Sequence, residues 1–273
     1  MEKHIYNKVG RWAHGLLSLG LIALILLLAA CSNIADDERL IYVKPAPAKR
    51  AVLLEDFTGQ RCVNCPRGTE VIEQLQRDYG DSVVIAVGIH GGPLGFKGSA
   101  TVKGLATDLG DDYYKHWNLE YQPVGLINRH GAVNYSDWTA KVKEALAAPA
   151  TLTLKAAASI ADQKISIDIE AMGTDGTTTG KLQVWLLEDN ITAMQLMPDG
   201  SANADYVHNH VLRATVNGPW GDDITLREGE LKEYSYTYTL DERWTADNMD
   251  IVAFVYNDEG VQQVVQSGIT QLK

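Results

Sequence analysis

Apolar and polar positions follow two different patterns along this chain, and the pattern changes near residue 149. Between residues 51 and 148, short apolar runs such as 51–57 and 83–89 alternate with stretches of helical spacing. Beyond Pro149 the period becomes two, as in Ile165, Ile167 and Ile169, which alternate with polar residues. The pattern predicts an α/β domain over residues 51–148 and an all-β domain over residues 149–273.

The first domain is expected to run strand, helix, strand, helix, strand, hairpin, helix. The uninterrupted apolar run of its second strand is typical of a covered sheet. Ser136 is the expected N-cap of the last helix. The predicted elements are strand 51–57, a helix from about 66 to 78, strand 83–89, a helical region around 100–117, strand 123–128 and a helix through 138–146.

The second domain carries about seven stretches of alternating character. A two-sheet sandwich of immunoglobulin-like type fits this number of strands best. The domain contains no cysteine, so it lacks the disulfide of antibody domains.

The first 30 residues have the parts of an export signal. Basic residues at the start are followed by an apolar run from about residue 16 to 30, which is too short for a comfortable membrane span. The run ends Leu28-Ala29-Ala30-Cys31 and resembles the lipobox of bacterial lipoproteins. This resemblance implies cleavage before Cys31 and a membrane anchor through lipid on that residue. The alternative is an ordinary signal peptide that happens to contain a cysteine.

Residues 31–50 are interpreted as the lipidated cysteine and a flexible tether. An acidic run at 36–38 resembles signals that send some lipoproteins to the cell surface, and a solvated linker is the alternative. The chain has a net charge of −11, and loss of three basic residues and one acidic residue with the signal brings this to about −13. Such a charge excludes nucleic acid as a partner.

The two remaining cysteines, Cys62 and Cys65, form a C-x-x-C motif between a predicted strand and a predicted helix. Unpaired amide groups and the helix dipole at this position stabilise a thiolate. The context favours a redox dithiol over half of a zinc site. In an oxidising compartment the two thiols can form a disulfide.

The order of elements around this motif resembles a thioredoxin-like domain. Asp56, six residues before Cys62, matches the buried acid that exchanges a proton with the second cysteine. Pro123 matches the cis-proline whose loop faces the dithiol and holds the substrate backbone. Two positions depart from the pattern: Arg61 replaces the usual tryptophan, and Pro66 follows the second cysteine.

Nearly the full chain resembles the family of outer-membrane lipoproteins related to the twenty-eight-kilodalton outer-membrane protein of Gram-negative oral and gut bacteria. The segments that carry this resemblance are 53–66, with the sequence LLEDFTGQRCVNCP, and 206–213, with the sequence YVHNHVLR. The resemblance implies a cell-envelope location at the outer membrane, facing the periplasm or the surface.

His208 and His210 are weak candidates for a metal site. On a strand they would project from the same face, and a third ligand could complete a zinc or copper site. No further ligand has suitable spacing, so a surface or loop pair is the favoured interpretation. The sequence implies no cofactor.

Two functions remain open. The first is thiol–disulfide exchange on exported proteins or on an envelope protein partner, with Cys62, Cys65, Asp56 and Pro123 as the catalytic residues. The second is a non-catalytic binding or structural lipoprotein with a vestigial thioredoxin fold. Retention of Asp56 and Pro123 favours the first, because a permanent disulfide needs neither.

Overall fold

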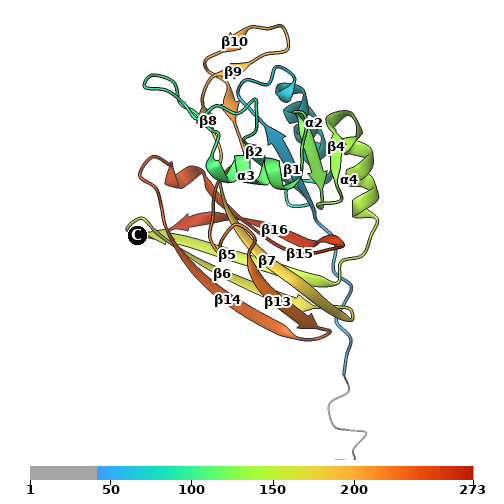
Figure 1. The fold of residues 1–273 in the computed structure, drawn as a ribbon. Coiled ribbons are helices and arrows are strands. Elements are labelled where there is room, and N and C mark those ends of the chain that lie inside the picture. Colours follow the sequence, from blue (N-terminus) through green and yellow to red (C-terminus); the bar gives the residue numbers. More distant parts are fainter. Residues whose placement is uncertain (1–41, 273) are drawn as a thin grey trace, which may run out of the picture. The chain divides into compact units, whose positions relative to one another are not determined.

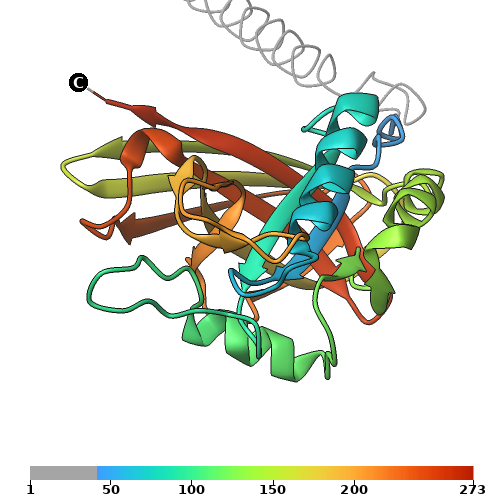
Figure 2. The same ribbon diagram turned by 90° about the horizontal axis from the view of Figure 1, so that it is seen from above.

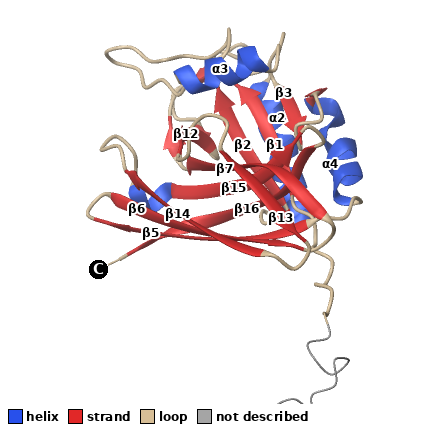
Figure 3. Cartoon of the chain, turned by 60° about the horizontal axis from the view of Figure 1, so that its bottom comes forward, coloured by secondary structure: helices blue, strands red, loops and turns tan. Residues whose placement is uncertain are grey.

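The computed structural model describes residues 42–272 and is mostly one large mixed β-sheet with few helices (Figures 1 and 3). Residues from Lys44 onward form one compact unit. The predicted export signal, Cys31 and the first part of the predicted tether lie outside the described residues. None of the helices in the described range is long and apolar enough to cross a membrane.

The first half of the unit alternates strands and helices, as its sequence predicts. The parallel strands β1 (Val52–Thr58) and β2 (Val84–His90) are joined by α2 (Cys65–Tyr79) and are buried along their whole length. On its other edge β1 pairs antiparallel with β3, which pairs in turn with β4. The other elements of this half are α3 (Asp108–His116), β3 (Val124–Ile127), β4 (Ala132–Asn134) and α4 (Trp138–Leu146).

One local prediction held only in part, and another was wrong. The helical region expected around 100–117 contains only α3, which begins after Thr107 caps it by accepting a hydrogen bond from the Gly110 N–H. Before it, a Cβ on Gly104 would collide with the backbone nitrogen of Gly98, so this stretch is a tightly packed loop. The last helix is not capped by Ser136: the Asn134 side chain accepts from the Ser136 N–H and starts the 3-10 turn η3 (Tyr135–Asp137), ahead of α4.

The second half is built from long strands that pair in two sets. One set has the order β14-β6-β5 and the other the order β13-β7-β15-β16, with antiparallel neighbours throughout. The last residues of β16 also run parallel to β5. These strands are β5 (Leu152–Ala161), β6 (Lys164–Gly173), β7 (Thr177–Glu188), β13 (Asp222–Arg227), β14 (Leu231–Thr239), β15 (Met249–Asn257) and β16 (Gly260–Gln271).

Strands β7 and β15 are buried on both faces. The isoleucines of β6 pack in one apolar cluster with Val184 of β7, whereas Trp185 of β7 and Phe254 of β15 point the other way. These aromatic residues share a second cluster with Leu53 of β1 and Ile85 of β2. β12 (Val211–Thr215) pairs with β7 and, through Val211, with β2, so the two halves share one sheet as well as one core cluster.

Between β7 and β12 the chain leaves the sheet as the 189–210 segment. It forms two short antiparallel pairs, and Figure 2 shows it beside the start of α2. The pairs are β8 (Ile191–Thr192) with β11 (Val207–His208), and β9 (Gln195–Leu196) with β10 (Ala202–Asn203).

Candidate functional site

The two cysteines lie at the turn between β1 and α2. They form a disulfide. Helix α2 begins at Cys65, and Pro66 lies in its first turn, where a backbone N–H has no partner within the helix, so the missing N–H of proline costs no hydrogen bond. Val63 and Asn64 between them are exposed. Cys62 and Cys65 themselves are only 1% and 2% exposed. The disulfide is therefore covered, although the loop that carries it lies at the surface.

Asp56 lies on the face of β1 that points toward α2. Val52 and Leu54 of the same face pack in the apolar cluster beneath α2 and α4, and strand alternation brings Asp56 to that side. Burial raises the pKa of Asp56 to about 8, and its Oδ1 has no hydrogen-bond partner among the described residues. Asp56 and Cys65 line the same cavity of about 50 Å³. A carboxyl group with this pKa can exchange a proton with the second cysteine near neutral pH.

Pro123 follows a cis peptide bond, as the sequence predicts. Its Cβ is 3.5 Å from the position that a Cβ on Gly68 would take, so the proline turn packs against the first turn of α2. Gln122 fixes this turn: its side-chain nitrogen donates to the backbone oxygens of Thr58 and Gly91 at 2.7 and 3.0 Å.

The 189–210 segment covers the disulfide. The side-chain nitrogen of Gln195 donates to the carbonyl oxygen of Cys62 at 2.9 Å, and the Leu196 N–H donates to the Gln60 carbonyl at 2.9 Å. Gln60 is fully buried and bonds with its side chain to Met194 in the same segment and to Leu105 before α3. No pattern in the sequence indicates this cover, because glutamine is common at surfaces and the side-chain bonds of Gln60 to Met194 and of Gln195 to Cys62 each join residues more than a hundred positions apart.

His90 and His208 meet in the cavity beside Asp56. Their rings are 5.3 Å apart between centroids, and burial lowers the pKa of His208 to about 4 and that of His90 well below its ordinary value. Both are therefore neutral at physiological pH. His210 adopts a positive φ of 57° after β11 and its ring approaches Asp189, so the two candidate histidines contact different groups. No set of three or more His, Cys, Asp or Glu side chains that could hold a metal occurs among residues 42–272.

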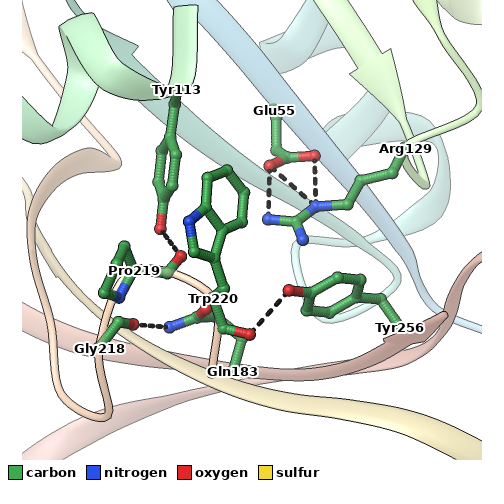
Figure 4. A network of polar contacts seen from close by, with 8 residues as sticks. All are labelled: Glu55, Tyr113, Arg129, Gln183, Gly218, Pro219, Trp220 and Tyr256. Carbon is green, nitrogen blue, oxygen red and sulfur yellow. Dashed lines mark hydrogen bonds and ion pairs between the residues drawn. The ribbon is translucent and has the colours of Figure 1, made fainter. Parts of the chain in front are cut away.

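A buried ion pair lies on the opposite face of β1. Arg129 follows β3, and its Nε and Nη2 atoms lie 3.2 to 3.3 Å from the carboxylate of Glu55 (Figure 4). The guanidinium carbon lies 4.2 Å from the ring centroid of Tyr256. The sequence carried a signal for this pair that was missed: a glutamate inside a fully buried strand requires a charged partner.

Comparisons with known proteins point to one family of the outer membrane. The family model described as "Outer membrane protein Omp28" matches residues 110–273. The structure of HBP35 of Porphyromonas gingivalis is similar with a TM-score of 0.64 and 16% identity, covering 81% of this chain and 76% of that one, which shows a shared fold. A domain of the outer membrane lipoprotein Omp28 from Porphyromonas gingivalis is 32% identical over 45% of this chain and 92% of its own, with a TM-score of 0.35. A search of curated proteins gave no match.

Proposed function

We propose that this chain, which belongs to the Omp28 family of outer membrane proteins and is an outer-membrane lipoprotein of the cell envelope, performs thiol–disulfide exchange on exported proteins. The observation that carries the proposal is the placement of Asp56 in one cavity with Cys65, at the start of α2 and beside the cis-proline turn. A disulfide that only stabilised the fold would need neither a proton carrier nor this turn.

The exchange proceeds in two steps when the pair starts reduced. The Cys62 thiolate attacks one sulfur of a partner disulfide, forms a mixed disulfide and releases the other partner sulfur as a thiolate, which takes a proton from water. Cys65 then transfers its proton to the ionised form of Asp56, which is the minor form at neutral pH because the pKa is about 8. The resulting Cys65 thiolate attacks Cys62. The second partner sulfur leaves as a thiolate and takes the proton back from Asp56. The Cys62–Cys65 disulfide forms, and the partner gains the two electrons that the pair loses.

The proposal assigns residues 51–148 to a thioredoxin-like domain. It rests on the strand order β2-β1-β3-β4, with α2 between the parallel strands, and on the matching positions of the cysteines, Asp56 and Pro123. Residues 149–273 are proposed to be the immunoglobulin-like domain. The pairing of β14, β6 and β5 in one set and of β13, β7, β15 and β16 in the other supports this assignment.

A reductase assay with insulin tests the exchange, using the wild type and the Cys62→Ser, Cys65→Ser and Asp56→Asn variants. Cys62→Ser should abolish turnover, and Cys65→Ser should accumulate a mixed disulfide with the substrate. Asp56→Asn should slow turnover by roughly 100-fold, a typical loss for a general acid or base. Absence of turnover in the wild type, together with a pair that remains oxidised under strong reductant, would exclude the reaction.

A non-catalytic role is the second candidate, and burial of the disulfide under the 189–210 segment favours it. In that case the pair would join the start of α2 to β1 permanently, and the fold would serve as a binding surface for an envelope protein. Cells in which Cys62→Ser/Cys65→Ser replaces the wild type then show an unchanged redox state of exported thiols.

The anchor is proposed to be lipid on Cys31, after removal of residues 1–30 as a signal, with residues 31–50 as the tether. Radiolabelled palmitate should be incorporated by the wild type and not by Cys31→Ser. Labelling of the variant would refute the assignment.

A further inference from the structure

The loop that carries the disulfide has an exposed arginine on each side of the cysteine pair. Arg61 directly precedes Cys62. Arg67 lies in the first turn of α2, two residues after Cys65, and its N–H donates to the Asn64 carbonyl at 3.0 Å. The Cα atoms of the two cysteines are 5.3 Å apart. Both arginine side chains are therefore attached to the chain within two residues of a sulfur of the pair.

Arg61 is held by an aromatic ring and not by a carboxylate. Its guanidinium carbon lies 4.7 Å from the ring centroid of Phe96, which is a cation–π contact, and its N–H donates to the Leu94 carbonyl at 3.1 Å. Among residues 42–272, neither Arg61 nor Arg67 forms an ion pair with a carboxylate. The guanidinium N–H groups of Arg61, whose fork matches a carboxylate, therefore remain available to a partner.

The charge of this stretch is opposite to that of the chain. The chain has 35 acidic and 24 basic residues, yet residues 57–69 contain two arginines and no acidic residue. Helix α2 has no acidic residue in its first turn and no side-chain cap, so the positive end of its dipole is not compensated there. Asp56 is mostly neutral at neutral pH, because burial raises its pKa to about 8. The surface around the dithiol therefore attracts negative charge.

Two acidic residues lie close to this stretch along the chain or beside the proline turn. Glu70 is the first acid of α2, and Glu120 precedes the turn that contains Pro123. Both are exposed, and within the described residues neither forms an ion pair with an arginine. The two guanidinium groups are thus not neutralised by direct contact with the protein's own carboxylates.

Exposed apolar side chains lie beside the arginine. Val63, between the cysteines, is 40% exposed, and Tyr121, which precedes Gln122, is 44% exposed. Leu94 connects the two regions: its N–H donates to Oε1 of Gln122 at 3.1 Å, while its carbonyl accepts from Arg61. A partner bound at Arg61 therefore lies beside the proline turn as well as beside the disulfide.

We propose that this surface recognises an acidic segment around the reacting cysteine of the partner protein, an inference that rests on the proposed exchange reaction. A carboxylate of the partner accepts hydrogen bonds from the guanidinium of Arg61, a second carboxylate lies near Arg67, and an apolar side chain contacts Val63. Arg61, at the position where the thioredoxin pattern has tryptophan, thereby determines which partners dock. If Arg61 only packed against Phe96, the dithiol would show no preference for charge.

Three blocked peptides that differ only in charge test this preference. Each contains one cysteine, flanked on both sides by two glutamates, two glutamines or two lysines, and is used in excess to reduce the oxidised protein from residue 44 onward, which is one compact unit. Two peptide thiols are oxidised to a peptide disulfide, and the Cys62–Cys65 pair gains two electrons and two protons. Alkylation of samples quenched at intervals, followed by mass spectrometry, gives the rates.

The measured quantity is the rate with the glutamate peptide divided by the rate with the lysine peptide. Opening of the 189–210 segment is common to both rates and cancels in this ratio. The intrinsic reactivities of the two peptides cancel when the ratio is compared between protein variants. The glutamine peptide should give an intermediate rate after the same comparison.

Three variants locate the preference. Arg61→Gln/Arg67→Gln should lower the ratio at least tenfold at low salt, because one pair of unit charges about 4 Å apart in water is worth roughly fivefold. Arg61→Lys keeps the charge and should retain most of the ratio. Lys49→Gln/Lys164→Gln removes the same charge from exposed positions in the tether and at the start of β6, and should leave the ratio unchanged. In 0.5 M NaCl, where the screening length is about 4 Å, the ratios should converge.

A fall in the ratio that is confined to the arginine variant supports the proposal. Thermal unfolding checks that each variant is folded, and if the double arginine variant is not, a fall of about threefold in Arg67→Gln decides. The proposal is overturned if the wild type and the arginine variant give the same ratio, if the lysine variant lowers it as much, or if no peptide reduces the wild type. Turnover with insulin is a separate result, so loss of the charge preference is distinguishable from failure of the exchange reaction.

Discussion

Asp56 places a carboxyl group inside a buried strand, so its ionisation should change the free energy of unfolding of the whole protein. The unfolded chain ionises it near its ordinary pKa of 3.8, whereas the folded chain holds the proton up to about pH 8. Between these values the folded state binds more protons, so the free energy of unfolding falls as pH rises.

Asp56→Asn should remove this pH dependence. Relative to the variant, the wild type should lose stability on the order of a few kcal/mol between pH 4 and pH 8, as a shift of several pKa units implies. Urea unfolding of both proteins across this range measures the difference. The exposed Asp81→Asn serves as control. Parallel stability curves for wild type and Asp56→Asn would contradict the burial of an ionisable group at this position.

The Glu55–Arg129 pair gives a second prediction at the residue scale. Burial raises the pKa of Glu55 and the Arg129 guanidinium opposes that rise. Arg129→Met should destabilise the protein by about 3–5 kcal/mol, because it leaves a carboxylate buried without its partner. Glu55→Leu/Arg129→Met, which removes both charges, should recover most of this loss. Denaturant unfolding of the two variants compares their free energies of unfolding. A double variant that is less stable than Arg129→Met would disprove the prediction.

Which site residues the sequence could predict depends on how local their signal is. Cys62, Cys65 and Asp56 lie within ten residues of one another, so strand and helix spacing place them together, and the X-Pro motif at Pro123 carries its own backbone signature. The partner of Glu55 could not be read from the chain, because Arg129 is brought to it only by the pairing of β1 with β3. The expectation for His208 and His210 assumed a continuous strand, and the positive φ of His210 interrupts it.

At the scale of elements, we expect the 189–210 segment to control access to the disulfide. Gln195 makes hydrogen bonds to the carbonyls of Gly59 and Cys62 at 3.3 and 2.9 Å, and the disulfide below them is buried. Reduction therefore requires local opening of this segment, whose free energy is smaller than that of global unfolding.

Gln195→Ala should make the disulfide easier to reduce. Loss of hydrogen bonds worth about 1 kcal/mol each should speed reduction by dithiothreitol at least fivefold. It should lower the free energy of global unfolding by a similar amount, because the open state and the unfolded state both lack these bonds. Alkylation of samples quenched at intervals, followed by mass spectrometry of the protein, reports the rate. Thr192→Ala, an exposed substitution in the same segment, is the matched control. Equal rates in wild type and Gln195→Ala would mean that the segment does not gate the pair.

Elements with strong periodicity were predicted well, and elements defined by long-range packing were not. The helix expected from about 66 to 78 is α2, and the alternating strands of the second half are β5, β6, β7 and β14. The loop before α3 was mistaken for helix, because its close contacts between Gly98 and Gly104 are tertiary and leave no period in the sequence. The short strands of the 189–210 segment are two residues each, below the length at which alternation is visible.

At the scale of the whole molecule, the change of period near residue 149 marks a change of architecture within one shared sheet. The family resemblance stated from the sequence is confirmed by the match over residues 110–273, which spans the change. The sequence did not indicate that β7 and β15 contribute side chains to the apolar clusters of both halves. The strand with Leu182, Val184 and Leu186 reads as simple alternation, and only the packing reveals its second apolar face, through Trp185. The uninterrupted apolar run 251–255 of β15 is a signal of burial on both faces that was missed.

This shared layer predicts that the first half will not fold alone. In a chain of residues 44–148, the faces of β1 and β2 that carry Leu53, Phe57, Ile85 and Val87 would lose the cover of β7 and β15. Burial of each such side chain contributes roughly 1.5–3 kcal/mol, so losing much of it removes a large part of the roughly 5–15 kcal/mol that stabilises a typical domain.

The isolated fragment should therefore be expanded, bind a hydrophobic dye and unfold without a cooperative transition, whereas residues 44–273 should unfold cooperatively. Near-ultraviolet circular dichroism and calorimetry of the two chains distinguish these states. Adding residues 149–273 in trans should restore part of the tertiary signal, because that fragment supplies the missing layer. A sharp thermal transition in residues 44–148 alone would mean instead that the α/β half has a complete hydrophobic core of its own, and that β7 and β15 only pack against a domain that is already stable.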